Sequence, residues 1–191
     1  SIAYLAGYLI KYGFEPAVYD EHIENLDPEI LRRQMEQLAQ PRIVGISSVT
    51  LTASRAYEIA AWTKEIDPEA IVVVGGIHPT VMPVEVLEQK TVDIVVRGEG
   101  EETIKVLVEK IFAKEDYLTD IAGISYVKEG NIVRNCDRPF ISDLDEIPTI
   151  PYHLFADHKE RYSNFAVILG SRGCPYPCTF CSARSMSGMK Y

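Results

Sequence analysis

The 191-residue sequence lacks several features that mark special classes of protein. No apolar run approaches the roughly 20 residues that a membrane-spanning helix needs, and the longest, residues 2–10, is interrupted by Gly7. No charged segment followed by an apolar core and a cleavage site opens the sequence, so no secretory signal is expected. The sequence also has no internal repeat or low-complexity tract. These absences predict a globular cytoplasmic protein without a membrane span.

Positive charge is scarce in this chain. Lys and Arg together number 19 against 28 Asp and Glu, which gives a formal net charge of −9, and no Lys/Arg run forms a local basic patch. Because an acidic surface repels phosphate backbones, nucleic acid is not expected as a partner.

Cysteines are few, and their placement is more informative than their number. Cys174, Cys178 and Cys181 fall close together, whereas Cys136 stands alone beside a predicted hairpin. A disulfide scaffold would spread its cysteines through a short secreted chain. Clustered thiols without a secretory signal instead predict metal ligands in a reducing compartment. We interpret Cys136 as a plain thiol.

Helical and strand patterns alternate through the first part of the chain. Helical spacing of apolar residues covers 2–10, 28–38 (with Asp27 as N-cap), 53–66, 81–89 and 101–113. Strand patterns cover 15–20, 42–48, 70–76 and 93–96. This alternation predicts an α/β fold, a doubly wound Rossmann-like parallel sheet of the flavodoxin type, over residues 1–115. Such a domain begins with a strand, yet this sequence opens in a helix, so its first strand is expected to be missing.

The remaining sequence has a different character. Residues 116–160 are predicted to form a β-hairpin (121–128 and 131–135, around Glu129-Gly130) and a linker rich in acids and prolines. Residues 161–191 contain an apolar strand at 165–169, which is a candidate to fill the gap in the sheet, followed by the cysteine loop. We expect this last segment to be the start of a further domain.

Three predicted strands end in residues suited to binding a ligand. In doubly wound folds, ligands bind at the carboxyl ends of the strands, where glycines allow close approach and hydroxyls and helix N-termini offer donors. The candidates are Ser47, Ser48 and Thr50 after one strand, Gly75, Gly76, His78 and Thr80 after the next, and Gly98 and Glu99 after the third. Taken singly, each has a simpler interpretation as a turn, a helix cap or a structural histidine.

The cysteine loop has the spacing C-x3-C-x2-C, from Cys174 through Cys178 to Cys181. Three thiolates on one tight loop suit a [4Fe–4S] cluster with one iron left open for a further ligand. A zinc site generally needs four ligands, so one alternative is a zinc knuckle completed by His153, His158 or Cys136, and the other is a chance clustering of thiols.

The string SRGCPYPCTFCS resembles the radical S-adenosylmethionine (SAM) superfamily. Together with GGIHPT and DIVVRGEGEE, it makes residues 1–183 similar to the cobalamin-binding radical SAM proteins. The resemblance implies that Cys174, Cys178 and Cys181 hold the cluster and that SAM binds its open iron. It also implies that the nucleotide tail of cobalamin lies against Ser47, Thr50, Gly75 and Gly76, and that His78 and residues 99–101 lie near the corrin or a domain interface.

Members of that family methylate unactivated carbon or phosphorus, or perform oxidative cyclisation as the anaerobic magnesium-protoporphyrin monomethyl ester cyclase does. The resemblance therefore implies a small-molecule substrate and a reducing electron donor such as flavodoxin. The chain is expected to be an inactive fragment of such an enzyme, and no catalytic residue is assigned within it. The alternatives are a corrinoid-binding module without radical chemistry and a zinc-stabilised α/β regulatory domain.

One segment matches only part of a motif found in another class of cobalamin-binding proteins. Those proteins ligate cobalt through the histidine of an Asp-x-His-x-x-Gly loop, and Asp20-Glu21-His22 matches only the first half of that pattern. The glycine is absent, and the segment follows what should be the second strand. We therefore interpret His22 as a surface residue.

Overall fold

The computed structural model describes residues 2–188 except 115–117, 166–168 and 182. Its centre is a five-stranded sheet in the order β1-β2-β3-β4-β5. The strands are β1 (Ile43–Ser47), β2 (Ile71–Gly75), β3 (Ile94–Val96), β4 (Ile124–Lys128) and β5 (Asn131–Arg134). The first three are mutually parallel, and the last two join antiparallel. The carboxyl ends of β1, β2 and β3 therefore share one edge of the sheet.

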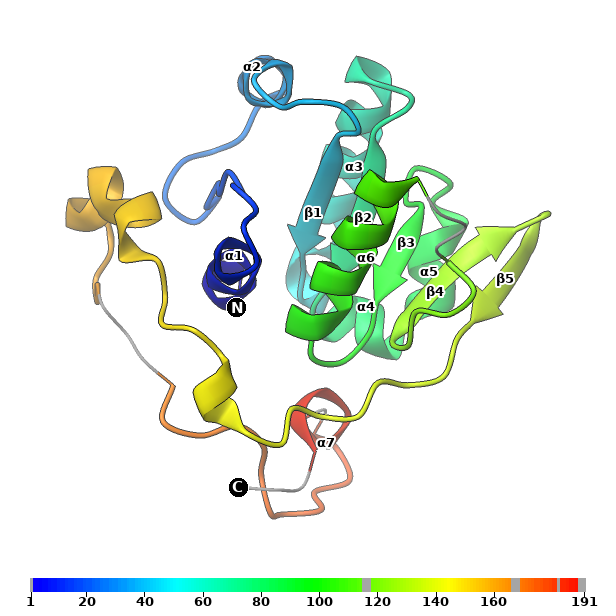
Figure 1. Cartoon of the computed structure of the whole chain (residues 1–191), viewed down its shortest axis with the longest axis vertical. Coiled ribbons are helices and arrows are strands. Elements are labelled where there is room, and N and C mark those ends of the chain that lie inside the picture. The colour runs from blue at the N-terminus through cyan, green and yellow to red at the C-terminus, as the bar shows by residue number, and fades with distance from the viewer. Residues whose placement is uncertain (1, 115–117, 166–168, 182, 189–191) are drawn as a thin grey trace.

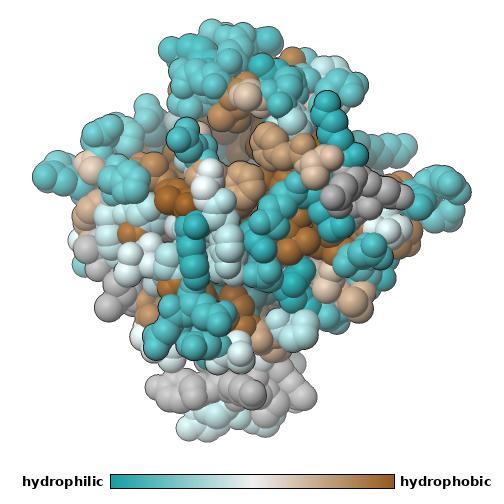
Figure 2. All heavy atoms as spheres, viewed as in Figure 1, coloured by the Kyte–Doolittle hydropathy of each residue, from teal (hydrophilic) through white to brown (hydrophobic). Residues whose placement is uncertain are grey.

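Helices cover both faces of the sheet, as the predicted α/β class requires (Figure 1). Side chains of a strand point alternately to its two faces. Val73 accordingly packs with Leu107 of α6 (Glu101–Ala113), whereas Val72 packs on the opposite face with Ala60 of α3 (Ala53–Ile66). The continuous apolar run of β2 is thus explained by burial on both faces. Figure 2 shows apolar atoms toward the middle of one face of the molecule and hydrophilic residues over its outer parts.

The predicted hairpin is present and forms part of the same sheet. β4 pairs antiparallel with β3, and Ile124 and Tyr126 join the core cluster of Val73 and Leu107. Glu129 and Gly130 both have positive φ angles, 52° and 77°, as the tight turn of a two-residue hairpin requires. The division into 1–115, 116–160 and 161–191 stays a prediction.

Two sequence predictions are wrong in detail. Residues 15–20 form no strand, because β1 is the edge strand of the described sheet and pairs only with β2, which leaves this segment without a partner. The helix expected over 81–89 covers only residues 83–88, as α5 (Pro83–Glu88), and a separate short helix that was not expected, α4 (Ile77–Val81), precedes it. Pro83 has no N–H to continue a helix but suits the first position of a new one. The predicted strand at 165–169 includes residues 166–168, which lie outside the described residues.

The remaining helices frame the sheet. α1 (Ile2–Lys11) packs against α6, and the hydroxyl of Tyr8 donates to Glu102 over 2.5 Å. α2 (Pro28–Glu36) is capped by Asp27 as predicted and ends two residues earlier than expected. The linker contains two 3₁₀ segments, η2 (Leu144–Glu146) and η3 (Tyr152–Arg161), and α7 (Ala183–Ser187) follows the cysteine loop. Among the described residues, no helix combines the length and the apolar character that a membrane crossing requires.

Candidate functional site

The loop after β1 approaches the loop after β2 very closely. The Ser48 N–H donates to the carbonyl oxygen of Gly75 over 2.9 Å. Gly76 has a φ of +107°, and a Cβ at this position would lie 2.5 Å from the Ser48 carbonyl oxygen. Glycine is therefore the residue that allows both the backbone conformation and the approach. Ser47 and Thr50 are exposed at the same end of the strand.

The loops after β2 and β3 are joined by a single hydroxyl. Thr80 Oγ1 donates to the carbonyl oxygen of Gly76 over 2.7 Å and accepts from the Gly98 N–H over 3.0 Å. Gly98 has a φ of +73°, and a Cβ there would meet nothing within 4 Å. The three predicted loops thus meet at one edge of the sheet, with open space beside Gly98.

His78 is buried in a hydrogen-bonded cluster with Tyr57 and Glu85, which the sequence did not predict. It is 4% exposed, and its Nε2 lies 2.9 Å from the hydroxyl of Tyr57, which donates to Glu85 over 3.1 Å. Because that proton goes to Glu85, the Tyr57 oxygen accepts from His78 Nε2–H. Burial, followed by the hydrogen bond to Glu85, raises the pKa of Tyr57 to about 12. In the sequence Tyr57 has only the helical spacing of a core residue, so nothing there distinguished it.

Two buried polar atoms near these strand ends have no protein partner. They are Ser48 Oγ and His78 Nδ1, and each belongs to a residue that is 4% exposed. A buried polar atom without a partner is costly, so such atoms call for a ligand or water. Ser48 directly follows β1, and His78 lies in the first turn of α4, which follows β2, so both atoms lie near strand ends, where ligands bind in this class of fold.

Glu99, a predicted cofactor contact, is engaged by two protein groups. Its Oε1 accepts from Arg172 over 3.3 Å, and its Oε2 accepts from the backbone N–H of Ile141 over 2.7 Å. Glu101 accepts from the other terminal nitrogen of Arg172 over 2.5 Å. Arg172 was not among the predicted site residues, although it lies two residues before Cys174. These contacts join the cysteine loop to the edge where β3 ends.

The cysteine loop lies below the carboxyl edge of the sheet, and α7 packs against α4 (Figure 1). Cys178 and Cys181 are exposed, and Cys174 is partly buried. Three thiols in one loop are the donor type that an iron–sulfur cluster needs. Within the described ranges, however, no three His, Cys, Asp or Glu side chains are gathered closely enough to hold a metal ion. The ligand role of these cysteines, and the zinc alternative with His153, His158 or Cys136, therefore stay predictions from spacing.

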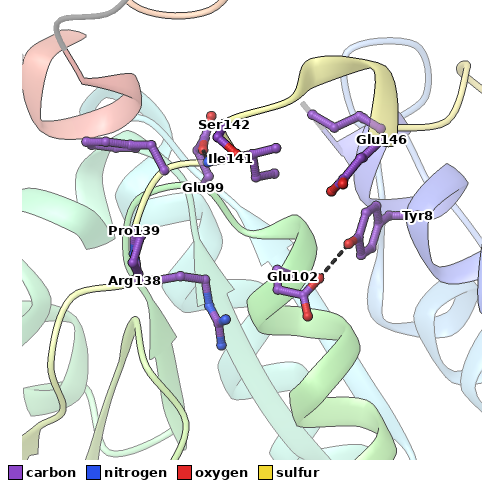
Figure 3. A pocket seen from close by; sticks show the side chains of 10 residues that line it. Tyr8, Glu99, Glu102, Arg138, Pro139, Ile141, Ser142 and Glu146 are labelled. Carbon is purple, nitrogen blue, oxygen red and sulfur yellow. Dashed lines mark hydrogen bonds between the residues drawn. The ribbon is translucent and has the colours of Figure 1, made fainter.

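A cavity of 310 Å³ lies between α1, α6 and residues 138–147 (Figure 3). Tyr8 and Glu102 point toward each other on one side of it, and Arg138 lies on the other. Arg138 donates to Thr103 over 2.8 Å. Glu99 also lines this cavity, so the cavity adjoins the edge where β3 ends without including the loops of β1 and β2.

The isolated Asp-x-His segment and Cys136 are on the surface. His22 is exposed, and the Asp20 carboxylate is engaged within the protein, because it accepts from the His22 N–H over 3.0 Å and from the distant Tyr162 hydroxyl over 2.9 Å. Cys136 is an exposed free thiol. The exposure of His22 agrees with the surface position expected from the sequence.

These features define a Rossmann-like α/β domain whose candidate site lies at the carboxyl edge of its parallel strands. The chain belongs to the B12-binding domain family, whose model matches residues 1–108. This result confirms the resemblance to cobalamin-binding proteins.

Several known proteins are similar to the whole chain. An uncharacterized methyltransferase (PH0819) of Pyrococcus horikoshii is 35% identical over 100% of this chain and 41% of its own length. The anaerobic magnesium-protoporphyrin IX monomethyl ester cyclase of Rubrivivax gelatinosus is 33% identical over 95% of this chain and 34% of its own length. The solved structure of OxsB, a cobalamin-dependent S-adenosylmethionine radical enzyme with aqua-cobalamin and S-adenosylmethionine bound, has a TM-score of 0.81 at 26% identity, covering 98% of this chain and 26% of that one. The chain thus spans less than half the length of these relatives.

Proposed function

We propose that this chain is the cobalamin-binding part of a cobalamin-dependent radical SAM enzyme, either a methyltransferase or an oxidative cyclase. In this proposal the loops after β1, β2 and β3 hold the corrinoid, and Cys174, Cys178 and Cys181 hold a [4Fe–4S] cluster that binds SAM. The supporting observation is that Arg172 joins the cysteine loop to Glu99 and Glu101, at the same edge as the three loops.

The residues at this edge fit a corrinoid. Cobalamin carries amide side chains and a nucleotide tail, which need donors and acceptors placed around a broad, flat ring. Ser48 Oγ and His78 Nδ1 are buried and unpartnered, Ser47 and Thr50 are exposed hydroxyls, and the space beside Gly98 is open. Gly75 differs from Gly98, because a Cβ there would lie in ordinary van der Waals contact with Val96, 3.6 Å from its carbonyl oxygen.

The two cofactors would supply methyl transfer and the one-electron cleavage of SAM. The part of this chain would be to bind and orient them: hydroxyl and imidazole groups hold the corrinoid, and the Arg172 contacts hold the cysteine loop near it. A small-molecule substrate, a reducing electron donor such as flavodoxin, and a cytoplasmic location complete the proposal. Thiol ligands require a reducing compartment to stay unoxidised.

A matched pair of serine variants tests the corrinoid site. Ser48→Ala removes a buried hydroxyl that has no protein partner, so the fold should tolerate it. We expect cobalamin binding, followed by absorbance, to weaken by about fivefold, the equivalent of one hydrogen bond of about 1 kcal/mol. Ser125→Ala is the control, because Ser125 Oγ is also buried and unpartnered but lies in β4. Equal effects of the two variants would count against the site.

Metal analysis after anaerobic reconstitution tests the cysteine loop. We expect iron and sulfide in the wild-type protein and in Cys136→Ala, and their loss when Cys174, Cys178 and Cys181 are all changed to alanine. Cobalamin binding should persist in all of these proteins. Uptake of zinc in place of iron would favour the zinc-stabilised regulatory domain, and cobalamin binding without any cluster would favour a corrinoid-binding module.

A further inference from the structure

Arg172 lies at the junction of three segments that are distant in the sequence. Its side chain is 13% exposed and contacts Glu99 and Glu101, whose side chains are 8% and 4% exposed. The guanidinium also lies over the ring of Tyr4 in α1, 5.5 Å from its centroid. The Tyr4 hydroxyl accepts the backbone N–H of Leu169 over 3.0 Å. Two independent contacts thus join the start of the cysteine loop to the body of the domain.

The geometry of this contact is specific to arginine. One terminal nitrogen binds Glu99 and the other binds Glu101, and each carboxylate belongs to the turn that leads from β3 into α6. A lysine ammonium is a single point charge and cannot reproduce this fork. The guanidinium is charged, because an arginine side chain does not lose its proton in proteins. Removing it would leave the buried carboxylates of Glu99 and Glu101 without this partner.

Glu99 extends the junction to the linker. Its second oxygen accepts the Ile141 N–H over 2.7 Å, so one carboxylate holds the linker backbone and the cysteine loop together. The opposite end of the loop is also held, because the Cys174 N–H donates to the carbonyl oxygen of Gly188 over 3.4 Å and α7 packs against α4. The cysteine loop is thus connected to the helices that follow both β2 and β3.

We propose that Arg172 is a positioning residue that fixes the cysteine loop against the carboxyl edge of the sheet through Glu99 and Glu101. By holding the loop, it sets the distance and orientation between a cluster bound by Cys174, Cys178 and Cys181 and a corrinoid bound at the strand ends. The second statement rests on the proposed function, whereas the first concerns the protein alone.

Hydrogen exchange of the full-length protein without cofactors tests the first statement. Arg172→Met and Glu101→Gln should speed exchange in residues 169–181 by about tenfold or more, because the loop loses the contact that limits its local opening. Arg172→Lys should give an intermediate effect, since the charge remains but the fork is lost. Exchange in β2 should stay unchanged if the variants fold normally.

Arg55 provides a matched control. It also binds two carboxylates, those of Glu21 and Glu58 at 2.5 Å each, and it also lies over an aromatic ring, that of Trp62 at 4.6 Å. Arg55→Met should therefore speed exchange near α3 and leave residues 169–181 unchanged. If Arg172→Met, Arg172→Lys and Glu101→Gln all leave the cysteine loop exchanging at the wild-type rate, the positioning role is refuted.

A spectroscopic measurement on the full-length holoenzyme tests the second statement. Pulsed electron paramagnetic resonance reports the distance between the reduced cluster and cob(II)alamin. We expect Arg172→Lys to broaden this distance distribution while its cobalamin affinity stays within about twofold of wild type, a change of less than 0.5 kcal/mol. Arg55→Met should leave the distribution narrow.

The two hypotheses fail in different ways. If no cluster forms in wild type but the Arg172 variants still loosen the loop, the proposed function fails and the positioning role of Arg172 stands. If cluster and cobalamin both bind and the Arg172 variants keep the wild-type distance distribution, control over cofactor geometry is refuted while the proposed function stands.

Discussion

Gly76 allows the loops after β1 and β2 to approach each other because it has no side chain. Its φ of +107° is unfavourable for residues with a side chain, and its position against the Ser48 carbonyl leaves no space for one. The approach of the first two strand-end loops therefore depends on this residue. The sequence indicated a glycine turn here, but only the structure shows what the glycine contacts.

We expect Gly76→Ala to lower the free energy of unfolding by roughly 2–4 kcal/mol, because backbone strain and a steric clash act together. Urea denaturation of the chain measures the change. Gly45→Ala in β1 is the control and should have little effect, since a Cβ there meets nothing within 4 Å. A Gly76→Ala protein as stable as wild type would contradict the packing described for these two loops.

Among the elements, α2 is specified almost entirely by local sequence. Pro28 occupies its first turn, and Asp27 accepts the Ile30 N–H over 2.7 Å, which satisfies one of the donors that a helix start leaves free. The helix then buries Leu31 and Met35. Such an element can be predicted from sequence because its signals lie within a few residues of one another.

Loss of the Asp27 cap should weaken α2 by a predictable amount. We expect Asp27→Ala to reduce stability by about 1 kcal/mol and Asp27→Ser to retain most of it, because serine can also accept the N–H. Thermal unfolding followed by circular dichroism provides the measurement. If serine proves no better than alanine at this position, the stabilisation does not come from the cap.

Elements that depend on distant partners were predicted less well. Residues 15–20 have a strand pattern, but a strand needs a neighbour, and β1 pairs only with β2 in the described sheet. The same limit applies to the site. That the loop residues after each strand lie at one edge could be predicted, because parallel strands end on the same side of a sheet, whereas their role in binding stays a prediction. Arg172 and Tyr57 could not be predicted, since their partners lie 71 and 28 residues away.

At the scale of the whole molecule, Arg97 joins the parallel strands to the hairpin. Its side chain is 3% exposed, pairs with Asp137, and donates to the carbonyl oxygens of Ile124 and Asn135 over 3.1 and 2.6 Å. Burial and the nearby charge of Arg134 lower its pKa, while Asp137 opposes them. Because Val73, Leu107 and Tyr126 also share one core cluster, hairpin and sheet should unfold as one unit.

We therefore expect Arg97→Met to lower the free energy of unfolding by roughly 2–3 kcal/mol. The substitution removes the side-chain donor to the Asn135 carbonyl oxygen, and it removes one of the donors to the Ile124 carbonyl oxygen and to the Asp137 carboxylate. Arg134→Met serves as the comparison, because Arg134 contacts the same Asp137 from a side chain that is 58% exposed. Its loss should cost under about 1 kcal/mol. In Arg97→Met, protection from hydrogen exchange should decrease equally in β2 and β4. Selective loss in β4 would mean that the hairpin opens independently.

The hydroxyl of Thr80 couples the segments that follow β2 and β3 at the carboxyl edge of the sheet. Because one oxygen bonds both the carbonyl of Gly76 and the amide of Gly98, neither loop can shift without straining the other. Glu99 follows Gly98 directly and accepts a hydrogen bond from Arg172. We expect a displacement of the loop after β2 to be transmitted, through Thr80 and Glu99, to the segment that carries the cysteines.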